Sequence, residues 1–435
     1  MRERQMMLLV AKQFKKDSDI GRLTKVLETL PDDQLIKAIE KTTLVGRPLK
    51  HPVRVLWHIF IAGIVYRHHY LSKVLDEMKR NSDLREACGI LRAQEVPKPY
   101  EMSRFVAKLV LHCKEVEDIF KDLVHRVKGE LPDFGESLAC DGKHVHTNAR
   151  GKKDDPSSDK EASWGVKTKN VTASDGKTHE SVFKWFGYKL HLLVDTAYEL
   201  PIAFTVTSAS ESEKAQMMPL IKQGAQNLSG KGVEVPKDIF EDVICCADKG
   251  YDAGELYKEA HEKYKIKPLI ALVEHRDPKT HEIVYERDRL TRIKNHVTGE
   301  WHDLKFLGYE KSRNALKYGC PCDGKGPCPF YGAGCNKATG GPGALFRIKL
   351  SDNYRYYTAI PRESKKWKRE YKRRTAVERV NSRLAQVLEI DHSGFRGRAK
   401  VGLRCMGGLI VMLAHALHCL KSGRIDAIRS LTKSA

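Results

Sequence analysis

The stretch VICCADKGY, residues 243–251, joins a run typical of a buried strand to a carboxylate, Asp248, and a Lys-Gly turn. An aspartate at this place often does no more than begin the turn after the strand. A second apolar run, residues 137–140, leads in the same way into Asp141 and Gly142. If the two strands are neighbours, both carboxylates lie at one edge of a sheet. The two stretches therefore raise the question of whether these acids serve only their turns or a shared site.

The segments around the two acids alternate between predicted strands and helices. Residues 185–194 and 202–206 have the pattern of strands joined by a short connection, whereas the polar residues 148–183 predict a long loop. A polar helix-like stretch, the strand before Asp248, a helical segment and a strand at residues 268–273 follow. We expect both Asp141 and Asp248 to end their strands. The order predicts an α/β fold, a mixed sheet flanked by helices.

The first 130 or so residues predict helices throughout. Residues 56–66 are nearly all apolar, which is typical of a central buried helix. In a later helix Met102, Phe105, Val106 and Leu109 follow the i, i+3, i+4, i+7 rule of one buried face. A small helical bundle with basic ends suits a DNA-reading module, and it equally suits an ordinary packing domain.

The composition favours a polyanion as the partner. The 435 residues include 77 Lys and Arg against 56 Asp and Glu, a net charge of +21. Neutralising phosphates is where such side chains contribute most affinity, so DNA or RNA comes first and a generally solvated basic surface is the alternative.

Several features favour a soluble, cytoplasmic protein without membrane contact. No secretory signal opens the chain, and the 11 cysteines point to a reducing compartment. The most apolar segment, residues 405–420, is shorter than the ~20 residues of a membrane span. We therefore predict that it is a buried core helix.

A third carboxylate, Glu378, lies in a predicted helix rich in Lys and Arg. Tyr371, Arg374 and Glu378 follow at i, i+3 and i+7, along one helical face. The plain alternative for Glu378 is a surface ion pair with Arg374 one turn earlier. Acids brought together repel unless a divalent cation holds them, and oxygen ligands without His or Cys favour Mg²⁺ or Mn²⁺. Three such acids can hold two ions that activate a nucleophile and stabilise the leaving oxygen at a phosphodiester.

At these residues the sequence resembles the DDE transposases of bacterial insertion sequences, whose core has the RNase H-like fold. The matches are Asp141 with Gly142, the hairpin GYKLHLLVD followed by Leu-Pro, the block ADKGYD and the signature Tyr-x2-Arg-x3-Glu. The helical region before them is similar to the domain that precedes this core in several such groups. One departure is that the family's Lys seven residues after the Glu is Ala385, so Arg383 is the candidate for that charge.

The resemblance implies a catalytic, metal-binding triad of Asp141, Asp248 and Glu378. It implies two Mg²⁺ or Mn²⁺ ions, cutting of the element's ends and joining of their 3′-hydroxyls to target DNA. Terminal inverted repeats and target DNA are the implied partners, with a homodimer on paired ends in a bacterial cytoplasm. The alternatives are a domesticated, non-catalytic DNA-binding regulator and an RNase H-like nuclease.

Basic and aromatic residues near the triad are the candidate DNA contacts. The tract of residues 362–374 interleaves Lys and Arg with aromatic rings, which suits backbone tracking with base stacking, although a solvated basic face is the plain alternative. The candidates are Tyr371, Arg374, Trp367, Lys143, His144, Lys249 and Arg383.

Four clustered cysteines, Cys320, Cys322, Cys328 and Cys335, suggest a possible structural zinc site. Their spacing differs from that of a standard zinc ribbon, and the alternative is a loop of unmetallated thiols. The predicted domains are a helical DNA-binding domain at 1–130 and the first part of the catalytic core at 131–274. An insertion with the cysteines at 275–355 and the last core helices at 356–435 follow.

Overall fold

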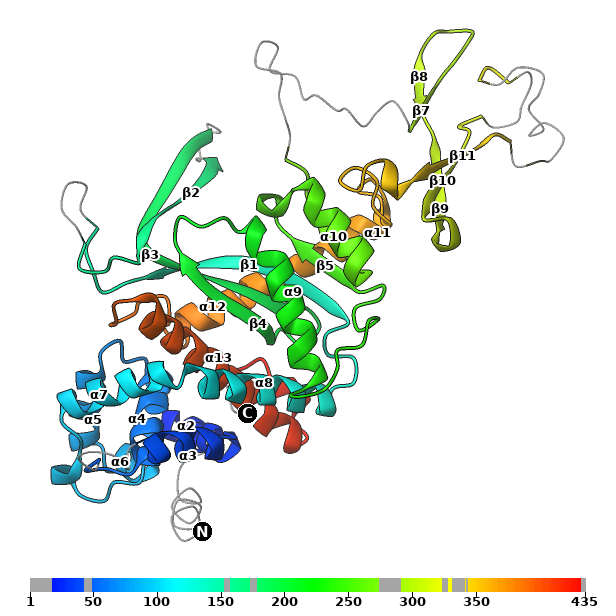
Figure 1. Cartoon of the computed structure of the whole chain (residues 1–435). Coiled ribbons are helices and arrows are strands. Elements are labelled where there is room, and N and C mark those ends of the chain that lie inside the picture. The colour runs from blue at the N-terminus through cyan, green and yellow to red at the C-terminus, as the bar shows by residue number, and fades with distance from the viewer. Residues whose placement is uncertain are drawn as a thin grey trace. The chain divides into compact units, whose positions relative to one another are not determined.

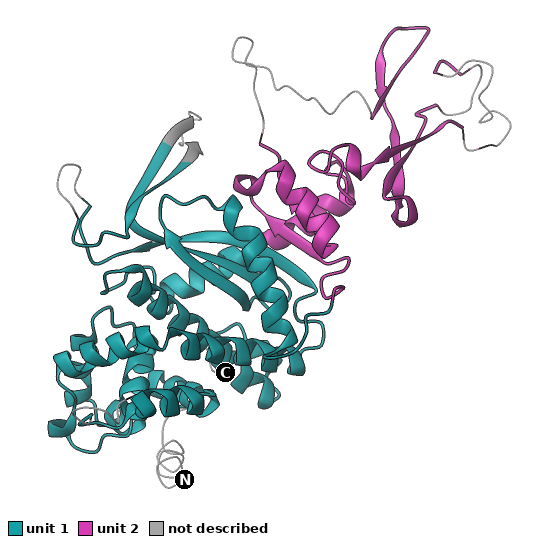
Figure 2. Cartoon of the chain, viewed as in Figure 1, with its two compact units in different colours: residues 1–236, 375–435 teal, residues 237–374 magenta. Residues whose placement is uncertain are grey.

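The computed structural model describes residues 18–42, 49–151, 157–172, 178–273, 291–322, 328–330, 341 and 343–431. The chain forms two compact units, as Figure 2 shows. The first comprises residues 1–236 and 375–435, and the second comprises residues 237–374. The predicted division into four functional domains stays a prediction.

The first unit opens with the helices that the sequence predicts. They are α2 (Asp19–Thr29), α3 (Asp33–Thr42), α4 (Val53–Val65), α5 (Leu71–Arg80), α6 (Ser82–Ala87), α7 (Pro99–Leu111) and α8 (Cys113–Glu130), drawn blue to cyan in Figure 1. Helix α4 is buried along nearly its whole length, as its apolar composition requires. Helix α7 begins at a proline and buries Met102, Phe105, Val106 and Leu109, the face that the periodicity predicts.

An antiparallel sheet follows, with β3 at its centre. Its strands are β1 (Ser137–His146), β2 (Ser163–Thr172), β3 (Thr178–Asp195) and β4 (Pro201–Ser208). Residues 187–195 of β3 pair with β1, residues 188–194 pair with β4, and residues 178–187 pair with β2. The two-stranded part made by β2 and the start of β3 extends away from the rest of the sheet (Figure 1).

That ribbon corrects the loop predicted for residues 148–183. Strand β2 lies wholly within that range, and β3 begins within it. The reason for the wrong prediction is exposure: Val166 is 57% exposed and Val182 is 49% exposed, so neither strand needs the alternation of buried and polar residues that marks a half-buried strand.

The place of Asp141 within its strand is a second correction. Asp141 was expected to end the strand, but it pairs with Leu192 inside β1, and the pairing continues to His146 opposite Gly187. The strand continues because β3 supplies backbone partners along this stretch and Val145 remains buried.

Helices cover both faces of this sheet. Neighbouring residues of a strand face opposite sides. Asp141 accepts a hydrogen bond from Asn381 of α12 (Thr375–Gln386), whereas a Cβ at Gly142 would lie 3.0 Å from Glu213, next to α9 (Lys214–Ser229). Helices α12 and α9 therefore lie on opposite faces.

Helix α13 (Arg398–Lys421) packs on β4 and on α2, α4, α7 and α8. It is the one helix of the described part that is long and apolar enough to cross a membrane, and 94% of its most apolar window is buried inside the protein. Because it is enclosed by other elements on several sides, its buried residues are nearly all apolar. The prediction of a buried core helix is confirmed.

The second unit contains a β-α-β element. Strand β5 (Ile244–Ala247) pairs in parallel with β6 (Lys267–Ile270), and α10 (Gly254–Tyr264) connects them. An antiparallel sheet of β9 (Lys305–Glu310), β10 (Ala315–Gly319) and β11 (Leu345–Lys349) and a pair of β7 (Arg292–Lys294) with β8 (Trp301–Asp303) follow, before α11 (Lys365–Tyr371). The mixed α/β class, with a helical N-terminal region, is confirmed.

Candidate active site

Helix α12, which carries the predicted third acid, packs against the strand of the first acid. Asp141 is 8% exposed, and its Oδ2 accepts a hydrogen bond of 3.2 Å from Nδ2 of Asn381. Asn381 lies three residues after Glu378 in α12, and residues at i and i+3 share a helical face. Glu378 itself is exposed, whereas the buried face of α12 consists of Ala376, Val377, Val380 and Leu384. Two acids of the predicted triad lie on adjacent elements of one unit.

A buried carboxylate holds α12 in this position. Glu199, at the turn between β3 and β4, accepts a hydrogen bond of 2.7 Å from Nε of Arg379 and forms an ion pair of 3.3 Å with Arg383. Arg383 also donates to the backbone oxygen of Glu199 at 2.6 Å. Burial lowers the pKa of Arg383, although Glu199 counters this effect. The structure uses the Arg383 guanidinium internally, and its DNA contact stays a prediction.

Lys143 and His144, which follow Asp141, are also held by protein contacts. Lys143 is 8% exposed, and its Nζ lies 3.7 Å from Asp391. Burial lowers the pKa of Lys143, and the negative charges of Asp391 and Asp141 oppose this. The ring of His144 packs 4.9 Å from that of Phe183, and burial lowers its pKa to about 4. An imidazole with this pKa is neutral at pH 7, so it brings no charge to a phosphate.

Asp248 directly follows β5, as the sequence predicts. Its Oδ1 accepts a hydrogen bond of 2.7 Å from the backbone N–H of Gly250, which caps the short helix η2 (Lys249–Tyr251). One oxygen of Asp248 thus serves the turn after β5, as the turn interpretation expects. A carboxylate has two oxygens and about four acceptor sites, so this turn does not exhaust it. The metal role of Asp248 stays a prediction.

Three of the candidate DNA contacts form a stack near Asp248. The rings of Trp367 and Tyr371 lie 4.3 Å apart at 15°, and the guanidinium of Arg374 lies over the Tyr371 ring at 5.9 Å. Burial raises the pKa of Tyr371, and the negative charge of Asp248 raises it further despite Arg374. The phenol therefore lies within electrostatic reach of Asp248. The two rings stack on each other, an arrangement that the sequence did not predict.

The basic tract contains an acid that its sequence pattern does not single out. Glu370 is 5% exposed and lies 2.8 Å from Arg369 and 3.0 Å from Arg373. Part of the positive charge of this tract is therefore neutralised within the protein. Lys365, Lys366, Lys368 and Lys372 of the tract are exposed.

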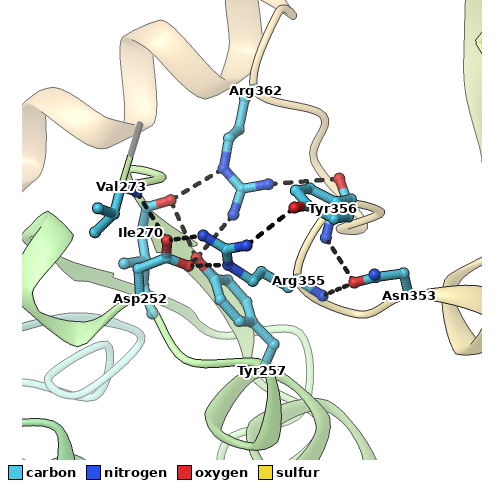
Figure 3. A network of polar contacts seen from close by, with 8 residues as sticks. All are labelled: Asp252, Tyr257, Ile270, Val273, Asn353, Arg355, Tyr356 and Arg362. Atoms are coloured by element: carbon cyan, nitrogen blue, oxygen red, sulfur yellow. Dashed lines mark hydrogen bonds and ion pairs between the residues drawn. The ribbon is translucent and has the colours of Figure 1, made fainter. Parts of the chain in front are cut away.

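A second overlooked residue, Asp252, anchors the segment that leads into α11 (Figure 3). Its side chain is 0% exposed and accepts hydrogen bonds from Arg355 at 2.7 and 2.9 Å and from the backbone N–H of Val273 at 2.8 Å. Arg362 donates to the oxygen of Ile270 at 3.0 Å and to the hydroxyl of Tyr257 at 2.8 Å. Arg362 thus fastens residues 353–362 to the end of β6, and Arg355 fastens them to Asp252, which directly follows η2.

The oxygen ligands of the predicted triad suit Mg²⁺ or Mn²⁺ by chemistry. Among the residues that the structure describes, no three His, Cys, Asp or Glu side chains form a group that could hold a metal ion. Asp141 and Glu378 belong to the first unit and Asp248 belongs to the second. The triad as a metal site stays a prediction.

The cysteine cluster is described in part. Cys320 and Cys322 are buried together with Phe330, and Cys328 packs against them. Cys335 lies outside the described residues. Zinc binding by the four cysteines stays a prediction.

Comparison with known proteins adds two findings. A family model described as "Transposase DDE domain" matches residues 134–414. A cryo-EM structure of the piggyBac transposase synaptic complex with hairpin DNA is similar with a TM-score of 0.39 and 12% identity, over 98% of this chain and 79% of that chain. No curated protein sequence matches the chain.

Proposed function

Because the chain belongs to the transposase DDE domain family, we propose that it cuts the ends of its own DNA element and joins the freed 3′-hydroxyls to target DNA. Asp141, Asp248 and Glu378 are its catalytic carboxylates. The observation that most directly supports this is the hydrogen bond of 3.2 Å from Asn381 to Asp141, because it joins the helix that carries Glu378 to the strand of the first acid.

The reaction is two successive substitutions at phosphorus. In the first, a water oxygen forms a bond to phosphorus, the bond to the 3′-oxygen breaks, and that oxygen takes up a proton to leave a 3′-hydroxyl. In the second, this hydroxyl attacks a phosphodiester of the target and the target's own 3′-oxygen leaves. Two divalent cations, when bound, activate the attacking oxygen and stabilise the leaving one.

The chain's own residues orient the reactants. Asp141, Asp248 and Glu378 would hold the cations through hard oxygen atoms. Arg374 and the exposed Lys249 next to Asp248 would bind phosphates, and the net charge of +21 supplies the general attraction to DNA. The inverted repeats, the target DNA and a homodimer on paired ends are part of this proposal, as is a bacterial, cytoplasmic setting.

The test is incubation of the full chain with DNA carrying the flanks of its own gene, in Mg²⁺ or Mn²⁺. New 3′ ends are mapped at nucleotide resolution, and joining to a labelled target duplex is measured in parallel. Glu378→Gln removes the third acid. Glu136→Gln is the matched control, since Glu136 is exposed and lies just before β1.

We expect metal-dependent nicks at the element boundary and joined products for the wild type and Glu136→Gln, and neither for Glu378→Gln, which still binds the DNA. Binding of the flanks by the wild type without cleavage in either metal would identify a non-catalytic regulator instead. Cleavage without any joining would identify a nuclease. Full activity of Glu378→Gln would remove Glu378 from the triad.

A further inference from the structure

The amide oxygen of Asn381 is a buried acceptor without a partner. Its Nδ2 donates to Asp141, but among the described residues its Oδ1 has no hydrogen-bond partner and is shielded from solvent. A buried polar atom left in this state is destabilising by about 1–3 kcal/mol. Such atoms are uncommon in native proteins and often mark a bound water, an ion or a catalytic role.

The position of this oxygen indicates what it binds. It belongs to the same planar amide as the nitrogen that contacts Asp141, so it lies beside that carboxylate. Glu378 lies one turn earlier on the same face of α12. The oxygen therefore lies beside one acid of the proposed triad and one helical turn from a second, where the ligand that its chemistry fits is a hard cation or the water on one.

We propose that Asn381 is a fourth side chain of the metal site. Its Nδ2 fixes the orientation of the Asp141 carboxylate, and its Oδ1 is an oxygen donor to the divalent cation, directly or through a bound water. This proposal rests on the proposed function in one respect, which is that Asp141 and Glu378 hold the cation.

An amide suits this position better than a carboxylate does. A further acid beside those of the triad would add like charge and disfavour their ionised forms. Asparagine supplies an acceptor without charge, and it also supplies the N–H donor that an ionised aspartate lacks. The position of Asn381 is fixed because its helix is held in place. Glu199 binds Arg379 of this helix, and Val377 and Val380 are buried.

The test compares Asn381→Ala and Asn381→Asp with Ser382→Ala, a half-buried neighbour on α12. The Mn²⁺ affinity of the full chain on a flank duplex is measured by electron paramagnetic resonance of free Mn²⁺. Loss of a side chain that orients a metal ligand typically weakens metal binding about 10–100-fold. We expect a loss of this size for Asn381→Ala, a smaller loss for Asn381→Asp, which keeps an oxygen, and no change for Ser382→Ala.

A second measurement separates metal binding from general structure. The metal concentration for half-maximal cleavage should rise for Asn381→Ala, saturating metal should restore most of the rate, and DNA affinity should stay unchanged. A lowered rate at every metal concentration would mean that Asn381 only supports the fold.

Two outcomes keep this inference distinct from the proposed function. Wild-type Mn²⁺ affinity for Asn381→Ala, together with lost affinity for Glu378→Gln, would overturn the role of Asn381 and leave the triad standing. A wild-type chain that binds no Mn²⁺, or a Glu378→Gln variant that binds it as well as wild type, would overturn both.

Discussion

Replacing Asp252 with asparagine removes a carboxylate that is 0% exposed and accepts two hydrogen bonds from Arg355, at 2.7 and 2.9 Å. The Arg355 side chain is 18% exposed, so little water can replace the lost charge. Removing one partner of a buried ion pair is destabilising by about 3–5 kcal/mol. Asparagine keeps one oxygen, but in either orientation its amide turns a donor toward an N–H of Arg355, and in one of them also toward the N–H of Val273. We therefore expect the lower end, about 3 kcal/mol.

Hydrogen exchange followed by mass spectrometry measures this change within the second unit. A loss of about 3 kcal/mol speeds exchange roughly 100-fold where opening of the unit controls it, since 1.4 kcal/mol corresponds to a factor of ten. Peptides from residues 249–273 and 353–374 should show the effect. Asp352→Asn is the control, because Asp352 is exposed in the same unit. Equal exchange in the two variants would refute the reasoning.

The same carboxylate has a defined dependence on pH. Burial alone would raise the pKa of Asp252, but hydrogen bonds from Arg355 and Val273 outweigh it and hold the pKa below its usual range. The unfolded chain binds this proton near the ordinary pKa of about 3.9. The stabilisation by Asp252 is therefore complete above that value and is lost as the pH falls below it. Asp252→Asn should lack this part of the acid sensitivity.

Other substitutions test packing and burial in the first unit. Gly407→Ala should lower the free energy of unfolding by about 1–3 kcal/mol, because its Cβ would lie 2.4 Å from Cδ1 of Ile64. Gly129→Ala in α8 should raise the free energy of unfolding by about 0.5–1 kcal/mol, because no neighbouring atom lies within 4 Å of the new Cβ. Urea unfolding measures both variants, and midpoints that shift in the same direction would contradict the two predictions. Burial raises the pKa of Asp195 to about 6, so the folded state holds a proton that the unfolded state releases near pH 4. The stability that Asp195 contributes should fall as the pH rises between these values, and parallel pH profiles for the wild type and Asp195→Asn would show the shift to be wrong.

Features that depend on local pattern follow directly from the amino-acid sequence. The burial of α7 and α13 follows from their own spacing and composition, and Asp248 follows β5 where the apolar run ends. The candidate triad is predicted from short motifs, each within one continuous segment, that resemble those of a known family. These features could be predicted because each depends only on residues within one continuous segment.

Only the tertiary structure decided which distant side chains meet. Asn381 and Asp141 are 240 residues apart, Arg355 and Asp252 are 103 apart, and Arg379 and Glu199 are 180 apart. The exposed ribbon of β2 and β3 was missed for a related reason, since it buries too little to impose a period on its residues. The periodicity of a segment reflects only which of its residues face solvent and which face the core. The contact of one polar group with another far along the chain depends on how the segments pack, and no local pattern contains it.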